Sequence, residues 1–563
     1  MKVIYTPHRG WRNQPPMIDG EDNVLSLGGN NWNDFDRYMT LNASLIFNRQ
    51  RFDIPLQLKL LIEGQNDTTQ KLNQLCDEGW DGVFPIPGVN YVSVPSDIDF
   101  YKAVLSKLGE EEATDVLRSI RDAGFFVAQG DDDARRLVEL TDFTVSLLRE
   151  SGAHKSYEDG WKLFQGIITE IKNFDLIFRC RQRQRKEIPF QFKSSLLPYD
   201  INVLIGSNGV GKSHCLKTLV SGWLQPSEQE NEDFVSCFND RPNFSKLILI
   251  SYSPFEEFNL DLSDAKLLDK TTYKYFGFRQ KTGVDDDGNI KIGINRHLPV
   301  LESSHSLIDA IYDDEKFSFI RNRVCKLEAA EEVLRPALKY DYCAFEISLS
   351  LEVEAIRRFT THIEGKDYLL VNEHIAKLVP IDTLKTACKL SEGVKFLKDG
   401  RVIGLSSGQR LFTYIVINVL GAIRENSLVV IDEPELFLHP TLEIEFIALL
   451  KAVLKPFRSK AILATHSLAV VREVPSNCVH IFRQIDETLD VVPPPFETFG
   501  ASVQKISSYV FGDKSVTKPF DDWLKKLVEN EPNVEKLIES LGDEINEQLM
   551  MKILRLGRQA HGS

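Results

Sequence analysis

Short, predominantly apolar runs mark the buried strands of the central part of this chain. Four of them lie at residues 201–205, 247–250, 427–431 and 461–465, each about the length of one strand. Apolar runs of this length are typical of parallel strands that are covered on both faces. A longer run at residues 410–423 has the length of a helix. The pattern predicts an α/β fold, with a mixed β-sheet flanked by helices.

Residues 174–194 show a different pattern, in which apolar and charged positions alternate. Such alternation predicts a β-hairpin, here at the edge of the central fold. Basic side chains gather near its tip: Arg179, Arg181, Arg183, Arg185 and Lys186. Two interpretations stay open, a solvated face that protects an edge strand and a contact with the phosphate backbone of a nucleic acid.

Residues 1–170 carry no recognisable catalytic constellation. A strand is predicted at residues 91–94, and helical periodicity covers residues 97–123 and 135–151. We interpret this part as an N-terminal accessory module. It precedes the main α/β domain at residues 171–500, which we call the head.

Within the head, residues 256–400 predict an inserted helical and β subdomain. The acidic stretch at residues 285–289 predicts a hairpin turn, because it lacks the closing glutamate of a calcium-binding loop. Residues 317–340 have the pattern of a helix. An insert of this kind offers a surface for DNA or for a partner protein.

The last part of the head predicts two further strands, at residues 479–482 and 489–492. The C-terminal region at residues 501–563 predicts helices that form a docking or dimer-supporting bundle. It is too short and too helical for a TOPRIM nuclease, and we find no HNH motif. The chain therefore shows no nuclease motif of its own.

The composition, with 42% hydrophobic and 26% charged residues, is that of an ordinary globular protein. A length of 563 residues exceeds one hydrophobic core and predicts roughly two to four domains. The apolar run at residues 411–423, about 13 residues long, is too short for a membrane span. Residues 1–7 lack a signal-peptide core, so we expect a cytoplasmic protein with no membrane association.

The cysteine pattern and the net charge restrict the cellular compartment and the binding partners that we expect. The eight cysteines are scattered, with no pair at metal-binding spacing, which predicts free thiols in a reducing compartment. A net charge of −15 argues against a protein that nucleic acid covers over most of its surface. It leaves room for a local basic groove.

A glycine-rich loop follows the first apolar strand directly. Its residues are Gly206, Ser207, Asn208, Gly209, Val210, Gly211, Lys212 and Ser213. This spacing predicts a phosphate loop (Walker A), in which backbone N–H groups wrap the phosphates of a nucleoside triphosphate. Lys212 is then expected to reach the β- and γ-phosphates, and the Ser213 hydroxyl to ligate Mg²⁺. A plain glycine-rich turn is the alternative, so other parts of the site must decide.

Two acidic residues end the strand predicted at residues 427–431, as in a Walker B element. We expect Asp432 to hold Mg²⁺ beside Ser213, directly or through water. Glu433 is placed to polarise the attacking water, and we assign it as the general base. Two ordinary surface carboxylates at a strand end are the alternative.

A third element precedes the long apolar helix and consists of Ser406, Ser407, Gly408 and Gln409. It offers N–H groups and a hydroxyl at the positive end of a helix, which suits an anion. The phosphate loop already covers the inner side of a triphosphate. We therefore expect this signature segment to contact the γ-phosphate held by a second protomer, although Ser-Ser-Gly is also a common turn.

His466 follows the strand predicted at residues 461–465. At this place a histidine can act as a switch residue that contacts the γ-phosphate, and we assign it to the catalytic group. A lone histidine at a strand end is more often structural. Its order and spacing after the other three elements favour the functional interpretation.

Taken in order, the phosphate loop, Leu-Ser-Ser-Gly-Gln, Asp-Glu and His resemble the head of an ABC-type ATPase. The string Asp-Glu-Pro-Glu-Leu-Phe-Leu-His-Pro at residues 432–440 is similar to that of OLD (overcoming lysogenization defect) proteins. It places the chain near the OLD, SMC and RecF ATPases rather than transporters. Two positions depart from the transporter pattern: no glutamine follows the strand at residues 247–250, and Ser407 replaces a glycine.

This resemblance implies an ABC-type P-loop NTPase head that binds ATP and Mg²⁺ and hydrolyses ATP. It also implies a homodimer or higher even oligomer, in which Ser406 and Gly408 of one protomer cap the nucleotide of the other. The chain resembles most the PtuA-like ATPases of Septu and retron-associated Septu antiphage systems. That likeness implies a dimeric switch or clamp that regulates a separately encoded HNH-type nuclease.

Two other functions stay open at this point. One is a RecF- or SMC-like ATPase for DNA repair or chromosome maintenance that clamps DNA directly. The other is a scaffold that binds ATP in order to assemble but hardly turns it over. The intact pair Asp432 and Glu433 argues against the scaffold.

Overall fold

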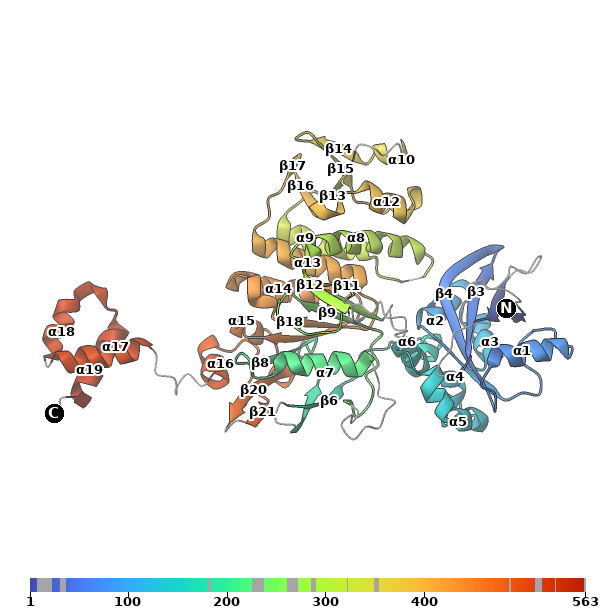
Figure 1. Cartoon of the computed structure of the whole chain (residues 1–563), viewed down its shortest axis with the longest axis horizontal. Coiled ribbons are helices and arrows are strands. Elements are labelled where there is room, and N and C mark those ends of the chain that lie inside the picture. Colours follow the sequence, from blue (N-terminus) through green and yellow to red (C-terminus); the bar gives the residue numbers. More distant parts are fainter. Residues whose placement is uncertain are drawn as a thin grey trace. The chain divides into compact units, whose positions relative to one another are not determined.

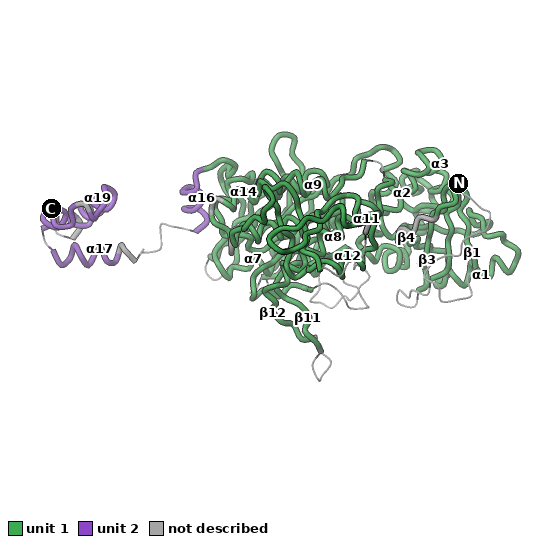
Figure 2. Tube along the Cα trace, turned by 90° about the horizontal axis from the view of Figure 1, so that it is seen from above, with its two compact units in different colours: residues 1–501 green, residues 502–563 purple. Residues whose placement is uncertain are grey.

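The computed structural model comprises two compact units, residues 1–501 and residues 502–563 (Figure 2). The residues that it describes are 1–7, 23–30, 37–180, 184–224, 237–260, 272–284, 290–320, 322–348, 354–485, 488–511, 519–531 and 533–560.

A seven-stranded sheet forms the centre of the first unit (Figure 1). Six of its strands are parallel, and the seventh runs antiparallel at one edge. The four predicted apolar runs all lie in it, which confirms the α/β fold. In spatial order the strands are β10 (Tyr273–Gly277), β9 (Lys246–Ser251), β18 (Ser427–Asp432), β19 (Lys460–Thr465), β8 (Ile201–Gly206), β20 (Val479–Ile485) and β21 (Thr488–Val492).

The register of the parallel strands brings the predicted chemistry to one edge of the sheet. Asp432 pairs with Ala464, and Thr465 pairs with Ile205, so β8, β18 and β19 end side by side. The phosphate loop, the Asp-Glu pair and His466 each follow one of these strand ends. The carboxyl ends of parallel strands are where α/β proteins place their ligand sites.

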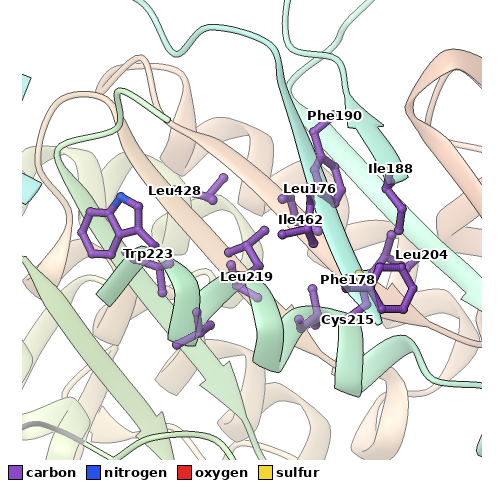
Figure 3. Close-up of a cluster of buried hydrophobic side chains, with 14 of the residues drawn as sticks. Leu176, Phe178, Ile188, Phe190, Leu204, Cys215, Leu219, Trp223, Leu428 and Ile462 are labelled. Carbon is purple, nitrogen blue, oxygen red and sulfur yellow. The ribbon is translucent and has the colours of Figure 1, made fainter. Parts of the chain in front are cut away.

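Helices cover both faces of this sheet. Figure 1 shows α7 (Lys212–Leu224) on one side and α13 (Ser407–Ala422) with α14 (Pro440–Leu454) on the other. The predicted apolar helix at residues 410–423 is α13. Figure 3 shows the core on the α7 side, where Cys215, Leu219 and Trp223 of this helix lie among side chains of the sheet, including Leu428 and Ile462. The core fixes the helix that begins at the phosphate loop.

The predicted hairpin at residues 174–194 is confirmed as β6 (Phe174–Arg179) and β7 (Arg185–Phe190). Its two strands form a sheet of their own and do not extend the edge of the central sheet. The apolar side chains of the hairpin pack into the same core as α7 (Figure 3). Arg179 and Arg185 are exposed, whereas Arg181 and Arg183 lie outside the described residues.

The N-terminal part of the first unit contains a five-stranded sheet and a group of short helices. Only β1 and β2 are parallel. The strand predicted at residues 91–94 is the edge strand β5. The strands are β1 (Lys2–Thr6), β2 (Val24–Gly29), β3 (Thr40–Phe47), β4 (Gln50–Ile62) and β5 (Tyr91–Pro95).

Two helix predictions in this part are wrong in detail. Residues 97–123 form two helices, α2 (Asp99–Leu108) and α3 (Glu110–Ile120), because Gly109 between them adopts a φ of 79°. Such a left-handed conformation interrupts a right-handed helix and favours glycine. Residues 135–151 contain the end of α5 (Asp132–Val138), a π-helical turn at Phe143–Leu147 and only the first residue of α6 (Ser151–Lys155).

The region at residues 256–400, predicted as an inserted helical and β subdomain, also contributes a strand to the central sheet. Its first described strand, β10, pairs with β9 and so belongs to the central sheet. The predicted hairpin forms between β11 (Arg279–Val284) and β12 (Ile290–Ile294), while its turn at residues 285–289 lies outside the described residues.

Two helices and a second five-stranded sheet follow the hairpin. The sequence pattern did not predict the helix α8 (Leu298–Lys316). The helix predicted at residues 317–340 is wrong in its first third, because α9 begins only at Lys326 and ends at Leu338. The sheet strands are β14 (Thr360–Ile363), β15 (Lys366–Leu370), β13 (Tyr342–Glu346), β16 (Val394–Lys398) and β17 (Arg401–Val402), all antiparallel.

The second unit is helical, as predicted. Leu524, Val528, Leu537 and Ile553 form its small core. Its helices are α16 (Val503–Val510), α17 (Pro519–Asn530), α18 (Val534–Leu541) and α19 (Glu547–Ala560). Among the described residues of the whole chain, no helix combines the length and the apolar character needed to cross a membrane.

Candidate nucleotide-binding site

The loop between β8 and α7 needs its glycines for reasons visible in the backbone. A Cβ atom at Gly206 would lie 2.1 Å from the carbonyl oxygen of Phe482 on the neighbouring strand β20. Gly209 and Gly211 adopt φ values of 73° and 113°, a region that side chains disfavour. The tight turn leads straight into α7, so the N–H groups of the loop and the helix start point to one place.

Lys212 folds back over this loop. Its Nζ donates hydrogen bonds to the carbonyl oxygens of Gly206 (3.0 Å) and Ser207 (3.2 Å), and lies 2.9 Å from Nε2 of His466. The residue is buried, and this burial lowers the pKa of the lysine to about 8. A phosphate group would restore the charge that burial disfavours, so Lys212 is suited to an anionic ligand.

The two predicted metal ligands are in contact. The Ser213 hydroxyl donates to Oδ1 of Asp432 over 3.0 Å. Asp432 is buried, and burial, with the nearby Glu433 carboxylate as second cause, raises its pKa to about 7. The nearby Lys212 ammonium offsets this rise only in part, so a bound cation would stabilise the carboxylate further.

This pair has the donor chemistry that Mg²⁺ prefers, a hydroxyl and a carboxylate oxygen. No group of three or more His, Cys, Asp or Glu side chains among the described residues could hold a metal by itself. Mg²⁺ is commonly bound by one or two protein oxygens together with water and substrate phosphates, so a two-residue site fits this ion.

Glu433 follows Asp432 directly but has different surroundings. It adopts a left-handed conformation with φ 51° and ψ 57°, which is uncommon for a residue with a side chain and turns it away from the strand direction. Its Oε1 lies 3.7 Å from Nε2 of His466, and the contact with this histidine is the main cause that lowers the pKa of Glu433. Glu433 is therefore ionised at neutral pH and can accept a proton.

The His466 ring contacts both Lys212 and Glu433, and a further acidic residue binds its backbone. Glu435 accepts a hydrogen bond from the backbone N–H of His466. Burial raises the pKa of this carboxyl group. Glu435 was not among the predicted site residues, although it lies in the string at residues 432–440 that carries the resemblance.

A cavity of about 270 Å³ lies over the phosphate loop. Sequence reasoning missed the part of its wall that β6, β20 and β21 supply, because none of these residues belongs to a recognisable motif. The lining residues are Phe178, Cys180, Gly209, Val210, Gly211, Lys212, Ser213, His214, Glu433, Gln484 and Leu489.

The signature segment begins α13 and is not part of this cavity. Ser406 caps the helix, since its hydroxyl accepts from the N–H of Gln409 while the Gln409 side chain accepts from the N–H of Ser406. Ser406 and Ser407 are exposed, and Gly408 is buried. None of residues 406–409 lines the cavity over the phosphate loop of the same chain.

Part of the chain matches a known protein family. Residues 400–472, which hold the signature segment, the Asp-Glu pair and His466, match the family described as "AAA domain, putative AbiEii toxin, Type IV TA system". Almost the whole chain is similar to protein ea59 of Escherichia phage lambda, with 24% identity over 541 residues that cover 93% of each protein.

Two solved structures of SMC heads are also similar to part of the chain. One is the head bound to the C-terminal winged-helix domain of ScpA, with 12% identity, a TM-score of 0.28, and coverage of 58% of this chain and 98% of that chain. The other is the SMC head domain from Thermotoga maritima, with 13% identity, a TM-score of 0.23, and coverage of 58% and 100%. The order of the strands and the place of the loop at their carboxyl ends give the chain the fold of an ABC-type P-loop ATPase head.

Proposed function

We propose that this chain binds and hydrolyses ATP with Mg²⁺ and that two copies close around the nucleotide as a switch. One observation carries the proposal. Two groups of contacts lie next to each other at the carboxyl edge of the sheet: the Ser213 hydroxyl with the Asp432 carboxylate, and the His466 ring with both the Lys212 ammonium and the Glu433 carboxylate. A structural loop would have no need for this sequence of charged groups.

Each residue has a definite task in this proposal. The N–H groups of the loop and Lys212 bind the phosphates, and Ser213 and Asp432 hold Mg²⁺, which supplies positive charge to the β- and γ-phosphates when bound. Glu433, ionised through its contact with His466, orients the attacking water and accepts its proton. His466 positions Glu433, and Glu435 positions the backbone of His466.

The exposed signature segment supports closure by a second copy. Ser406 and Ser407 are exposed at the start of a 16-residue helix that is otherwise largely buried. Their segment lies outside the cavity over the phosphate loop of the same chain. A second protomer that approaches head to tail would bring its own Ser406 and Gly408 to the γ-phosphate, and each site would need both chains.

The biological setting that we propose is the conflict between bacteria and phages. The family matched at residues 400–472 is named after a toxin of a toxin–antitoxin system, and the relative that covers 93% of this chain comes from a phage. Because the sequence has no nuclease motif, we infer that the switch regulates a separately encoded, HNH-type nuclease. For this role we propose DNA as a binding partner and the cytoplasm as the location of the protein.

The SMC-like alternative lacks support from the middle of the chain. A direct DNA clamp of that type would hold long coiled-coil arms between its phosphate loop and its signature segment. The described residues between Ser213 and Ser406 instead form short strands and helices, of which α8, with 19 residues, is the longest.

The test of the ATPase function uses two substitutions with different expected results. Lys212→Ala should abolish ATP binding, whereas Glu433→Gln should leave binding intact and lower turnover about a hundredfold or more. Matched controls are Lys217→Ala, on the same helix but paired with Glu257, and Glu445→Gln, an exposed residue of α14. Unchanged ATP binding in Lys212→Ala, or wild-type turnover in Glu433→Gln, would contradict the proposal.

The setting has a separate test. Phages should form fewer plaques on cells that carry this gene with its natural neighbouring genes than on cells without it. The Glu433→Gln substitution should remove this protection. Equal plaque numbers with and without the gene would overturn the defence role and leave the ATPase assignment standing.

A further inference from the structure

A second cavity, of about 260 Å³, lies within the first unit and shares no lining residue with the cavity over the phosphate loop. Three parts of the chain form its walls. They are α2 and Leu163 of the N-terminal part, described residues between α8 and α9 together with the first residue of α9, and two connections of the head, which lead from α13 to β18 and from α14 to β19. The cavity therefore touches the end of the signature helix and the start of the strand that carries Asp432.

Basic side chains predominate in its lining. Five described lining residues are basic and only two, Asp99 and Glu425, are acidic. Asp97 pairs with Arg424 (2.7 Å), and Asp313 pairs with Lys326 (2.8 Å). Glu425 pairs with both Lys102 (3.0 Å) and Arg458 (2.9 Å), so Arg323, at 3.9 Å from its acidic neighbour, has the longest ion-pair distance of the five. The five basic residues are Lys102, Arg323, Lys326, Arg424 and Arg458.

Arg323 has hydrogen-bond donors to spare. It donates to the carbonyl oxygen of Asp313 over 3.2 Å, and its guanidinium lies 3.9 Å from the carboxylate of the same residue. The guanidinium also lies over the Phe317 ring, 4.3 Å from its centre. An arginine carries five N–H donors in a planar fork that matches phosphate, so most of them remain for a ligand.

Lys246 lies on β9 near Arg424 and Lys326. Its side-chain ammonium forms no hydrogen bond and no ion pair with the residues that the structure describes. Burial, together with Arg424 and Lys326, lowers the pKa of Lys246 well below its usual range. A bound anion would relieve this accumulation of positive charge.

The remaining lining combines apolar side chains with hydrogen-bond acceptors. Ile320, Ile423 and Phe457 supply apolar surface. The Asp99 and Glu425 carboxylates can accept hydrogen bonds from hydroxyl or amino groups, and the Asn322 amide can both donate and accept. A simple inorganic anion would use only the cations of such a site.

We propose that this cavity binds a nucleoside monophosphate, with its phosphate at Arg323 and its sugar and base between the acidic and apolar residues. Such a ligand carries a dianionic phosphate, hydroxyl and amino donors, and a flat ring that favours apolar surface. A ligand of this size fits a cavity of about 260 Å³, which is small for a ligand site. This inference goes beyond the proposed ATPase function and does not depend on it.

The experiment measures binding in full-length protein with the phosphate loop disabled. In the Lys212→Ala background, AMP, GMP, CMP and UMP are titrated separately by calorimetry, up to about 1 mM. At least one of them should bind saturably, with one site per chain. Adding Arg323→Gln should weaken this binding about tenfold or more, because it removes a charge-assisted phosphate contact. Adding Val324→Trp should block the same binding by filling the cavity.

The control is Arg118→Gln, which changes an exposed arginine of α3 that lines neither cavity. It should leave the affinity within about twofold. The proposal is overturned if none of the four nucleotides binds, or if the affinity in Arg323→Gln and Val324→Trp equals that in Arg118→Gln. Neither result affects the ATPase assignment, which the comparison of ATP binding between wild type and Lys212→Ala tests independently.

Discussion

Asp432 and Glu433 are neighbours in the chain, yet their surroundings give their carboxyl groups opposite properties. Asp432 ends a buried strand, and its pKa rises to about 7. Glu433 turns into a left-handed conformation beside His466, and its pKa falls. Two carboxylates whose pKa values are driven apart can take different roles in one reaction. Here the first is suited to a cation and the second to a proton.

The raised pKa of Asp432 predicts that this residue lowers the free energy of unfolding of the ligand-free protein, by an amount that depends on pH. We call this loss of stability its cost. The usual pKa of 3.8 applies to the unfolded chain and about 7 to the folded one. Between these values the folded chain binds a proton that the unfolded chain has released, so the free energy of unfolding falls as the pH rises from about 4 to 7. The cost is complete above pH 7.

Asp432→Asn should therefore stabilise the protein in the absence of nucleotide and Mg²⁺. We expect the melting temperature to rise by about 2 °C or more at pH 8 and by less at pH 5, because the asparagine stays neutral at both. The same change should abolish Mg²⁺-dependent ATP turnover. The control is Asp132→Asn, whose side chain is 99% exposed. A lower melting temperature at pH 8 would mean that Asp432 stabilises the fold and is not held for a cation.

At the scale of elements, short apolar runs predicted the central sheet well and helical periodicity predicted helix ends poorly. β8, β9, β18 and β19 are buried on both faces, so almost every position in them must be apolar. Helix ends depend on single residues, and Gly109 divides one predicted helix into α2 and α3. The start of α9 at Lys326 depends on tertiary contacts with Asp313 and the end of α13 that no local pattern contains.

The same distinction applies to the site. The motif residues lie in short stretches whose spacing reveals them, and the sheet brings the phosphate loop, the Asp-Glu pair and His466 together at one edge, while the signature segment lies outside the cavity there. Phe178, Gln484 and Leu489, which complete the cavity wall, come from three separate strands with no fixed spacing between them. Glu435 acts through the backbone of His466, a contact that joins two loops 31 residues apart. Only the folded chain shows these relations.

Gly206 links the element scale to the site, because it ends β8 where β20 passes closely. Gly206→Ala would place a methyl group 2.1 Å from the carbonyl oxygen of Phe482, so the two strands must separate. We expect a loss of about 1–3 kcal/mol in the free energy of unfolding, together with weaker ATP binding. Denaturant unfolding measures the first and calorimetry the second. If the variant unfolds with the same free energy as the wild type, β8 and β20 can separate without loss of stability, and this prediction is wrong.

At the scale of the molecule, ion pairs connect the N-terminal part with the head next to β18. Asp97 pairs with Arg424 over 2.7 Å, and Lys102 pairs with Glu425 over 3.0 Å. Arg424 and Glu425 connect the signature helix α13 to β18, the strand that ends in Asp432. The N-terminal part is thus fastened to the segment between the two elements that a second protomer and the Mg²⁺ site would use.

The proposed closure predicts that a single substitution in the signature segment stops turnover while leaving ATP binding intact. Ser406→Arg places a large cation where the γ-phosphate of the other protomer would approach, outside the cavity over the phosphate loop of its own chain. ATP should still bind, with an affinity within about threefold of the wild type, while turnover is lost. The control is Ser195→Arg, an exposed residue in the loop before β8, at the opposite end of the strands. Normal turnover in Ser406→Arg would contradict the role of the segment.

Mixing two inactive variants tests the shared site most directly. Lys212→Ala keeps an intact signature segment, and Ser406→Arg keeps an intact phosphate loop, so a mixed pair of chains has one complete site. If the site is shared, an equal mixture should recover about a quarter of the wild-type rate of ATP hydrolysis, because half of the pairs are mixed and each has one of two sites. If each chain builds its site alone, the mixture will hydrolyse ATP no faster than the two variants measured separately.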